Sequence, residues 1–525
     1  MMSKMDRTSN RTYLMNSRNM HLLVFCLGLL LSIGLRFYHI DETPHSFWTV
    51  RQYSSPTLAR AMYLLDNPAT PDWMKSVLAE QSATVHRGEP PITEWIAVWL
   101  YRLTGHVSFW ALRITPVMAW ICAGIFLYRL GCRLFSPIVG LFAFLIHQLL
   151  PFGLIASRSI QPDSLMVAGM LGAQLLIVRY FQEPKRVRWW VAAIGSGVAI
   201  WLKPGLTQLA IAAVYFFLSL QVRGWRSTLK SLHLYGFLAL AALPAICHMA
   251  YENYAGRGLV SSFLLHDFQP RLLITVFYWK GWAGILTQIL GFVGPLLALL
   301  GILSALRRTQ GGAYLLGCGL AYFSINLITE WGASTHDYRH LQAIPLFALG
   351  IGLLMVQVLE RLRDRPFLAA GSVVVLAFSM VGSGRQYDLY DPGHQSYIEM
   401  CEQIGEKTDH SVHTIFMDYD WGTSLKYFGL IEGRYWPETQ VMSGLQQVGV
   451  QFPFAQPDLT AEERYHRFYE VDRPDYFVIC RVLHELDFQP GLQTFLNENY
   501  TVLDQGSRYI IYDLRPENQK NAPVF

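Results

Sequence analysis

The chain contains a long series of apolar segments, separated by short polar stretches, between residues 21 and 382. The first segment, 21–35, holds no acidic or basic side chain other than His21 and is about as long as a helix needs to cross much of a bilayer. Of the 525 residues, 52% are hydrophobic and only 15% are charged, unlike a water-soluble globular protein. The sequence therefore predicts an all-α, polytopic membrane protein in contact with membrane lipids.

Apolar length predicts about eleven membrane spans. The basic stretch ahead of the first span runs into a polar segment without a small-residue cleavage site, which indicates a permanent signal anchor. The predicted spans are 21–35, 109–130, 137–155, 164–181, 189–202, 206–220, 232–251, 282–306, 313–328, 341–359 and 367–382.

The positions of Lys and Arg predict the orientation of these spans, because basic residues concentrate in cytoplasmic loops. A cytoplasmic N-terminus places five basic clusters on the cytoplasmic side: 129–133, 185–188, 223–230, 307–308 and 361–365. We therefore expect a multi-pass protein of the cell inner membrane, whose polar loops and C-terminal domain are periplasmic or extracytoplasmic. The net charge of +4 does not indicate a nucleic-acid partner.

The chain divides in two by composition, at about residue 385. Residues 1–384 hold the predicted spans, whereas 385–525 alternate β-type and helical segments, which predicts a small α/β domain. Two cysteines of this domain, Cys401 and Cys480, are expected to be buried thiols rather than a disulfide. The expected strands are 412–417, 476–480, 500–503 and 509–514, and the expected helices are 395–406, 462–470 and 491–497.

The first outer loop, 41–105, contains helical segments that are too short to cross a membrane. In the segment 57–66 the apolar residues Leu58, Ala61 and Leu65 share one face, which is typical of a helix lying on the membrane surface. The piece 90–105 is amphipathic and rich in aromatic residues. We expect interfacial helices in this loop.

An acidic pair, Asp41 and Glu42, follows the first span directly. Such a pair can simply mark the end of a helix, but polar groups near membrane depth are often functional. Arg51 and the loop 158–163, which ends in Asp163, fall on the same side of the predicted topology. A carboxylate there could remove a proton from an acceptor hydroxyl or amine, so we favour a catalytic role.

Four cations, Arg51, Arg158, Lys203 and Arg339, lie on the predicted outer side, where the loop-charge rule does not require them. Arg presents a planar fork to phosphate oxygens and Lys a point charge. We expect these residues to bind the phosphate of a lipid-linked substrate. The alternative is that they only contact lipid headgroups or extend along apolar surface.

The loops contain a further group of His and Asp residues, namely His266, His336 and Asp337. His and carboxylate ligands suit several divalent cations, so a metal site is conceivable. Their spacing is not diagnostic, and a hydrogen-bonded loop is the favoured alternative.

Several short motifs occur in an order that resembles the GT-C glycosyltransferases, and within them the ArnT-like group related to dolichyl-phosphate-mannose-protein mannosyltransferases. The resemblance covers roughly 20–380. The matching pieces are Asp41-Glu42, His45-Ser46 with Arg51-Gln52, Glu89-Pro90-Pro91-Ile92, Arg113-Ile114-Thr115-Pro116, Arg158 to Asp163, Trp201-Leu202-Lys203-Pro204-Gly205, and Tyr338 to Pro345.

This resemblance implies a polyprenyl-phosphate-linked sugar as donor, and a glycan, lipid or protein as acceptor. It implies that Asp41 is the catalytic base, with Glu42 as the alternative, and that Asp163 orients Arg158 or lines the acceptor site. Phosphate binding falls to Arg158, Lys203 and Arg51, with Arg339 nearby, and substrate binding to His45, Glu89 and Tyr338. The chain departs from the related aminoarabinose transferases at Glu89, where many of them have Lys.

Two other functions fit the same topology. One is a transporter of lipid-linked sugar, but the spans carry few charges and no paired half-helix repeats. The other is a non-catalytic protein, or a ligase or polymerase of similar architecture. We favour an inverting glycosyltransferase that acts at the outer face of the membrane.

Overall fold

The computed structural model describes residues 3–85, 88–205, 207–255, 267–307, 309–447 and 453–518, with side chains from residue 19 onward except for 445–447 and 517. Its contacts divide the chain into two compact units. Unit 1 comprises Met1–Glu42, Arg87–Thr93 and Trp110–Leu389. Unit 2 comprises Thr43–His86, Glu94–Phe109 and Tyr390–Phe525. The chain therefore passes between the units five times.

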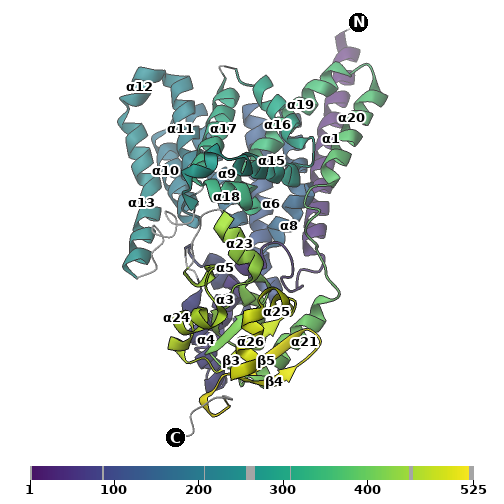
Figure 1. Ribbon diagram of the computed structural model, residues 1–525. Helices are drawn as coiled ribbons and strands as arrows, with labels where there is room; N and C mark the ends of the chain where they lie inside the picture. Colours follow the sequence, from purple (N-terminus) through teal and green to yellow (C-terminus); the bar gives the residue numbers. More distant parts are fainter. Residues whose placement is uncertain are drawn as a thin grey trace. The chain divides into compact units, whose positions relative to one another are not determined.

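Unit 1 is helical, with long helices that run in alternating directions (Figure 1). Apolar residues dominate these helices, and polar turns separate them. The α-helices are α1 (Ser3–Phe37), α6 (Phe109–Leu134), α7 (Pro137–Leu149), α8 (Pro151–Arg158), α9 (Asp163–Gln182), α10 (Arg186–Leu202), α11 (Gln208–Arg223), α12 (Trp225–Leu229), α13 (Leu232–Tyr254), α15 (Val276–Leu290), α16 (Gly294–Ser304), α17 (Gln310–Ile328), α18 (Glu330–Thr335), α19 (Ile344–Arg361) and α20 (Pro366–Val381). The 3-10 helices are η2 (Pro270–Ile274) and η3 (Asp337–Ala343).

Six helical segments within the described residues are long and apolar enough to cross a membrane, and two bent pairs raise the number to as many as eight. The pair α7 and α8 bends by 59°, and α15 and α16 by 90°. Two shorter apolar helices, α11 and α20, accompany them, and α10 has 17 residues. These lengths confirm a multi-pass membrane protein, whereas the count of eleven spans stays a prediction.

Small residues allow the helices of unit 1 to pack closely. A Cβ atom on Gly131 of α6 would lie 2.5 Å from the Cα of Gly140 in α7. A Cβ atom on Gly301 of α16 would lie 1.7 Å from the carbonyl oxygen of Gly350 in α19. Both distances are too short for real atoms, so only glycine permits these crossings, as is common between membrane helices.

Unit 2 contains a five-stranded mixed sheet with the order β2-β1-β3-β5-β4. Strand β1 pairs in parallel with β2 and β3, while β5 is antiparallel to both β3 and β4. β1 and β3 are buried throughout, and their side chains form two apolar clusters, one on each face of the sheet. The strands are β1 (Thr414–Met417), β2 (Gly433–Tyr435), β3 (Tyr476–Cys480), β4 (Thr501–Gln505) and β5 (Tyr509–Asp513).

Helices cover this sheet and confirm the predicted α/β architecture (Figure 1). The expected helices at 395–406, 462–470 and 491–497 correspond to α21, α24 and α26, whereas α22, α23 and β2 were not predicted. Cys401 and Cys480 are free and buried. The helices are α2 (Thr49–Gln52), α3 (Ser54–Leu64), α4 (Asp72–Thr84), α5 (Ile92–Thr104), α21 (His394–Lys407), α22 (Thr423–Gly429), α23 (Thr439–Gln447), α24 (Ala461–Phe468), α25 (Glu485–Phe488) and α26 (Pro490–Asn499), with short 3-10 helices η4 (Tyr419–Gly422), η5 (Pro453–Ala455), η6 (Glu470–Asp472) and η7 (Pro516–Asn518).

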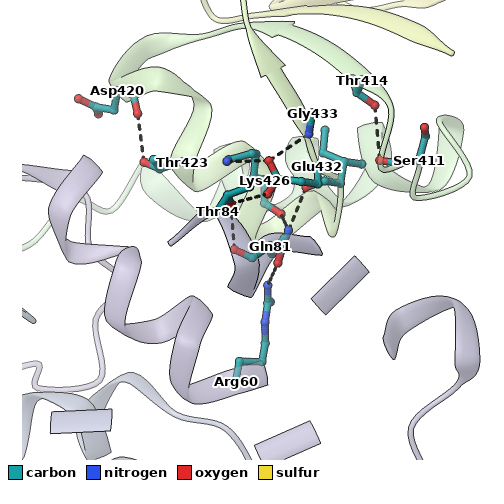
Figure 2. Close-up of polar contacts among 11 residues, drawn as sticks. Arg60, Gln81, Thr84, Ser411, Thr414, Asp420, Thr423, Lys426, Glu432 and Gly433 are labelled. Carbon is teal, nitrogen blue, oxygen red and sulfur yellow. Dashed lines mark hydrogen bonds and ion pairs between the residues drawn. The ribbon is translucent and has the colours of Figure 1, made fainter. Parts of the chain in front are cut away.

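Two helices of the segment 41–105, α3 and α4, pack against the C-terminal part of unit 2. The side-chain amide of Gln81 in α4 donates hydrogen bonds to the carbonyl oxygens of Lys426 and Ile431, at 2.7 and 2.9 Å. Its oxygen accepts a hydrogen bond from Arg60 of α3, at 3.0 Å (Figure 2). Arg60 also donates to the carbonyl of Tyr427. These bonds join segments that lie some 350 positions apart in sequence.

The apolar faces of the loop helices have different environments. On α3, Leu58 and Ala61 are buried within the protein, because this face packs inside unit 2 and not against lipid as the sequence pattern suggested. On α5, by contrast, Trp95, Trp99 and Leu103 are more than half exposed. An exposed aromatic and apolar face of this kind suits a helix at a membrane interface.

Candidate functional site

The loop that joins α8 to α9 is buried in unit 1 although its sequence is polar. α8 ends at Arg158 because Ser159 adopts an extended conformation, and α9 begins at Asp163 directly after Pro162. Arg158, Gln161 and Asp163 are each at least 95% buried. Burying three polar side chains in so short a loop is unfavourable unless each has a partner, so this loop is a candidate site.

Lys203 forms an ion pair with Asp163 at one end of this loop. Its Nζ lies 2.8 Å from the Asp163 carboxylate and 3.7 Å from the carboxylate of Glu89. The ring of Tyr338 has its centroid 5.9 Å from the same nitrogen. Pro204 cannot continue the ladder of α10, so the helix ends here and leaves Lys203 at its terminus. The structure therefore brings four predicted site residues together.

Two arginines hold the acidic pair close to the other end of the loop. Arg113 of α6 donates a hydrogen bond to the carbonyl oxygen of Arg158 at 3.1 Å, and another to the carbonyl of Glu42. Arg158 in turn donates to the carbonyl of His39 at 2.8 Å. These bonds fix the backbone that carries Asp41 beside Arg158.

Asp41 and Glu42 have different surroundings. The side chain of Asp41 is exposed, whereas Glu42 is half-buried and interacts electrostatically with Arg158. The consecutive carboxylates therefore have different environments. Glu42 is placed to balance a buried cation, and Asp41 is placed to meet a molecule from solvent.

Several buried polar atoms in and next to this loop have no hydrogen-bond partner among the residues that the structure describes. They are Nε and Nη1 of Arg158, both side-chain polar atoms of Gln161, Oδ2 of Asp163 and Oγ of Ser164. A buried polar group without a partner is destabilising by about 1–3 kcal/mol. Concentrating such groups in a single loop is typical of a site that binds a polar ligand.

Arg158 and Lys203 do not lie at opposite faces of a membrane. Lys203 contacts Asp163, and the five peptide steps from Arg158 to Asp163 can span at most about 18 Å. The hydrocarbon layer of a bilayer is about 30 Å thick. The two cations and four carboxylates therefore lie in one region of unit 1.

The remaining predicted residues of unit 1 lie in or next to η3, which contains Asp337 and Arg339 and directly follows His336. Arg339 forms an ion pair with Asp267 at 2.7 Å, so its charge is already balanced. Asp337 accepts hydrogen bonds from Tyr387 at 2.6 Å and Gln386 at 3.5 Å. His336 hydrogen-bonds the adjacent hydroxyl of Thr335 at 2.6 Å.

The proposed metal ligands are not brought together in the part of the chain that the structure describes. His266 lies outside the described residues, and no group of three His, Cys, Asp or Glu side chains among those described could hold a metal ion. His336 and Asp337 instead bond to protein groups. Metal binding stays a prediction.

Two predicted residues, His45 and Arg51, belong to unit 2. Arg51 lies in the last turn of α2, and Nδ1 of His45 contacts the carbonyl oxygen of Thr43 at 3.1 Å. The ring of His45 also faces that of His394, with centroids 5.6 Å apart. Burial, and then the neighbouring His45, lower the pKa of His394 to about 4.

Sequence reasoning assigned no individual role to Arg113, Gln161 or Ser164. Arg113 could have been found, since it is a charged residue inside the predicted span 109–130, whose other charged residue, Arg129, stands at the far end. Gln161 and Ser164 carry no such signal, because uncharged polar residues are ordinary in loops. Their burial becomes visible only in the structure.

The matching family model covers the centre of the chain. Residues 88–251 match the family described as dolichyl-phosphate-mannose-protein mannosyltransferase. This region includes Glu89, Arg158, Asp163 and Lys203. Among curated proteins, no match to the sequence is found.

Solved structures share the fold at low sequence identity. ArnT from Cupriavidus metallidurans in the apo state superposes with a TM-score of 0.57 and 14% identity, over 93% of this chain and 97% of ArnT. The archaeal oligosaccharyltransferase AglB from Archaeoglobus fulgidus gives a TM-score of 0.58 and 13% identity, over 94% of this chain and 74% of AglB. The resemblance to GT-C glycosyltransferases of the ArnT-like, mannosyltransferase-related group is confirmed, and the chain has their fold.

Proposed function

We propose that this chain is a membrane glycosyltransferase that moves a sugar from a polyprenyl-phosphate donor to a glycan, lipid or protein acceptor. The observation that carries the proposal is the buried Arg158, which has two guanidinium nitrogens without protein partners beside the acidic pair. Two relatives in fold support the donor class. ArnT was solved with undecaprenyl phosphate, at a TM-score of 0.55, and AglB with a dolichol-phosphate and an inhibitory peptide.

Arg158 is the better placed of the two cations to hold the donor phosphate. Its free Nε and Nη1 can each donate a charge-assisted hydrogen bond to an anionic oxygen such as that of a phosphate. Lys203 already contacts Asp163 and Glu89, so it can reach a phosphate only by sharing its charge with these carboxylates. We therefore assign the main phosphate contact to Arg158 and a supporting one to Lys203. A phosphate role for Arg51, and for Arg339, which is paired with Asp267, stays a prediction.

The reaction needs a base for the acceptor and a leaving group on the donor. Asp41 takes the proton of the acceptor hydroxyl or amine as its oxygen or nitrogen attacks the anomeric carbon. The bond from that carbon to the phosphate oxygen breaks, and polyprenyl phosphate leaves with the bonding electrons. Because the acceptor attacks opposite the phosphate, the anomeric configuration inverts.

The orientation in the membrane follows from the loop charges. We propose a cytoplasmic N-terminus and a periplasmic or extracytoplasmic unit 2 in the cell inner membrane. A reporter that is active only outside the cytoplasm, fused after residue 518, should be active. Activity of a strictly cytoplasmic reporter at the same position would reverse the orientation.

The catalytic role of Asp41 is tested with Asp41→Asn and Glu42→Gln. We expect Asp41→Asn to lower consumption of a polyprenyl-phosphate sugar by about 10²–10⁴-fold while undecaprenyl phosphate still binds. Loss of turnover only in Glu42→Gln would transfer the role of base to Glu42. Full turnover in both variants would contradict the mechanism.

The phosphate role is tested by binding of undecaprenyl phosphate to purified protein. Arg158→Ala should weaken binding by about 10- to 100-fold, because a charge-assisted contact is lost. Arg129→Ala removes an exposed cation of α6 and serves as the matched control. Equal binding in both variants would disprove the assignment.

The same assays distinguish the alternative functions. A transporter would move the lipid-linked sugar across a vesicle membrane without releasing polyprenyl phosphate. A non-catalytic protein would bind the lipid without consuming it, and a ligase or polymerase would consume a donor that carries a longer glycan.

A further inference from the structure

A cavity lies in unit 1, at the end of α10 opposite to Lys203. It has a volume of about 540 Å³ and is formed between α9, the start of α10 and the start of α13. Its lining includes Lys185 and Arg186, together with Tyr180, Trp190, Leu232 and His233. With 17 residues, α10 is about 25 Å long, so this cavity is separate from the candidate catalytic site.

The mouth of the cavity carries excess positive charge. Lys185 and Arg186 are exposed, and the nearest acidic residue in sequence is Glu183. Glu183 forms its ion pair with Arg188, which lies outside the lining. The segment 183–188 therefore has three basic residues and one acidic residue, a net charge of +2.

A third cation reinforces one wall of the cavity. Arg223 of α11 donates a hydrogen bond to the hydroxyl of Tyr180 at 2.9 Å, and another to the hydroxyl of Ser231 at 3.1 Å. Ser231 directly precedes α13. Arg223 thus connects the parts of the chain that carry Tyr180 and Leu232, and it adds positive potential behind them.

Apolar side chains continue from the cavity along both neighbouring helices. On α10, Trp190, Ile194 and Val198 recur at intervals of four residues and are 42–60% exposed. On α13, Leu232 is 85% exposed and Ile246 is 59% exposed. α10 and α13 pack against each other (Figure 1). Exposed apolar side chains therefore extend from the basic pocket along α10 and α13.

We propose that this cavity binds an anionic phospholipid. Its phosphate lies between Lys185, Arg186 and His233, and its acyl chains lie along the exposed faces of α10 and α13. Basic pockets between membrane helices bind anionic lipid headgroups in this way. The apolar surface favours a lipid over free phosphate, and the excess positive charge disfavours a zwitterionic headgroup with its own cation.

The test uses the full-length protein in lipid nanodiscs made of phosphatidylcholine, with or without phosphatidylglycerol. Native mass spectrometry counts the retained phosphatidylglycerol, and tryptophan fluorescence follows thermal unfolding. We expect the wild type to retain phosphatidylglycerol and to unfold at a higher temperature with it. In the double variant Lys185→Gln/Arg186→Gln, retention should fall by about 5- to 30-fold.

The matched control is Arg361→Gln/Arg363→Gln, which removes the same charge from exposed positions at the end of α19, outside the cavity. It should retain the lipid like the wild type. Equal losses in both double variants would show nonspecific charge attraction and overturn the proposal. An equal rise in unfolding temperature with inorganic phosphate alone would also overturn it, because the site would then bind a free anion.

Discussion

Two glutamines with the same exposure, 2%, have opposite surroundings in the two units. In unit 2, the amide of Gln81 donates to two carbonyl oxygens and accepts from Arg60, so its bonding capacity is nearly filled by the protein (Figure 2). In unit 1, neither polar atom of the Gln161 side chain has a partner. Burial of Gln81 thus stabilises the fold, whereas burial of Gln161 is explained better by a ligand.

The same contrast holds for buried charges. In unit 2, Arg481 donates two hydrogen bonds to Asp418, at 2.7 and 2.9 Å, and Tyr397 donates a third at 3.1 Å. In unit 1, Arg158 keeps two nitrogens without a partner. We therefore expect substitutions in unit 2 to affect stability and substitutions in the loop of Arg158 to affect binding.

The largest expected effect is that of Asp418→Ala. This variant leaves Arg481 without its carboxylate partner, which should lower the free energy of unfolding by about 3–5 kcal/mol. Thermal unfolding of the full chain in detergent measures the change. The control is Glu402→Ala, an exposed residue of α21, which should change stability by less than about 0.5 kcal/mol. Equal stability of the two variants would contradict the structural role of the pair.

The next prediction concerns how the stability of the protein depends on pH through Glu438, a carboxylic acid of unit 2 whose surroundings disfavour its charged form. Burial, and then the neighbouring Glu485, raise the pKa of Glu438 to about 7; Asp418 and Asp420 act in the same direction, and a hydrogen bond from Tyr435 opposes them. The folded protein thus holds this proton to a higher pH than the unfolded chain. The stabilisation that protonated Glu438 contributes is complete below about pH 4.5 and is lost as pH rises to about 7.

Glu438→Gln should remove this dependence of stability on pH. In the wild type, the free energy of unfolding should change by up to about 1.4 kcal/mol per pH unit within that range. Unfolding measured at pH 5 and pH 8 should show that the variant is more stable than the wild type only at pH 8. The exposed Glu399→Gln in α21 provides the comparison and should follow the wild type. An unchanged pH profile in Glu438→Gln would place the responsible proton elsewhere.

A smaller loss is expected for Gln81→Leu. Leucine fills a similar volume but leaves the carbonyls of Lys426 and Ile431 and one Arg60 nitrogen without their partner. We expect the free energy of unfolding to fall by about 1–3 kcal/mol. Limited proteolysis should also cut the segment 65–85 faster than in the wild type. Wild-type resistance to protease would mean that apolar contacts alone hold α4.

The smallest change in stability is expected for the same substitution at the other glutamine. Gln161→Leu removes two unpaired polar atoms, so stability should stay within about 0.5 kcal/mol of the wild type or rise. Binding of undecaprenyl phosphate should weaken several-fold. A large loss of stability in this variant would show that Gln161 is a structural residue, and the contrast between the two glutamines would then fail.

The parts of the structure that could be predicted from the sequence contain either long or regular runs of apolar residues or charged side chains. Spans such as α9 and α19 follow from apolar length, and the strands β1 and β3 follow from short apolar runs. The loop charges placed Asp163 and Lys203 on one side of the predicted topology, but Asp163 was expected to orient Arg158 or line the acceptor site, so its ion pair with Lys203 was not predicted. Glu89 also reaches Lys203, although its role could not be transferred from related proteins.

Other parts could not be predicted, because the same sequence pattern is compatible with more than one structural environment. The apolar face of α3 looks the same whether it meets lipid or protein, and only the partner segment near Tyr427 decides between them. Strand β2 has three residues, Gly433–Tyr435, too few for an alternating pattern. Gln161 gave no signal, since nothing in a single sequence distinguishes a buried uncharged residue from an exposed one.

The five passages of the chain between the units affect the order in which the protein can fold during synthesis. The loop segments of unit 2 are made first, and the C-terminal part of unit 2 that contacts α3 and α4 begins roughly 300 residues later. At ~5–20 residues per second, this interval lasts roughly 15–60 s. During that time the Gln81 amide lacks its two carbonyl acceptors and Arg60 lacks the carbonyl of Tyr427, so α3 and α4 complete their contacts only when the last segment of the polypeptide arrives.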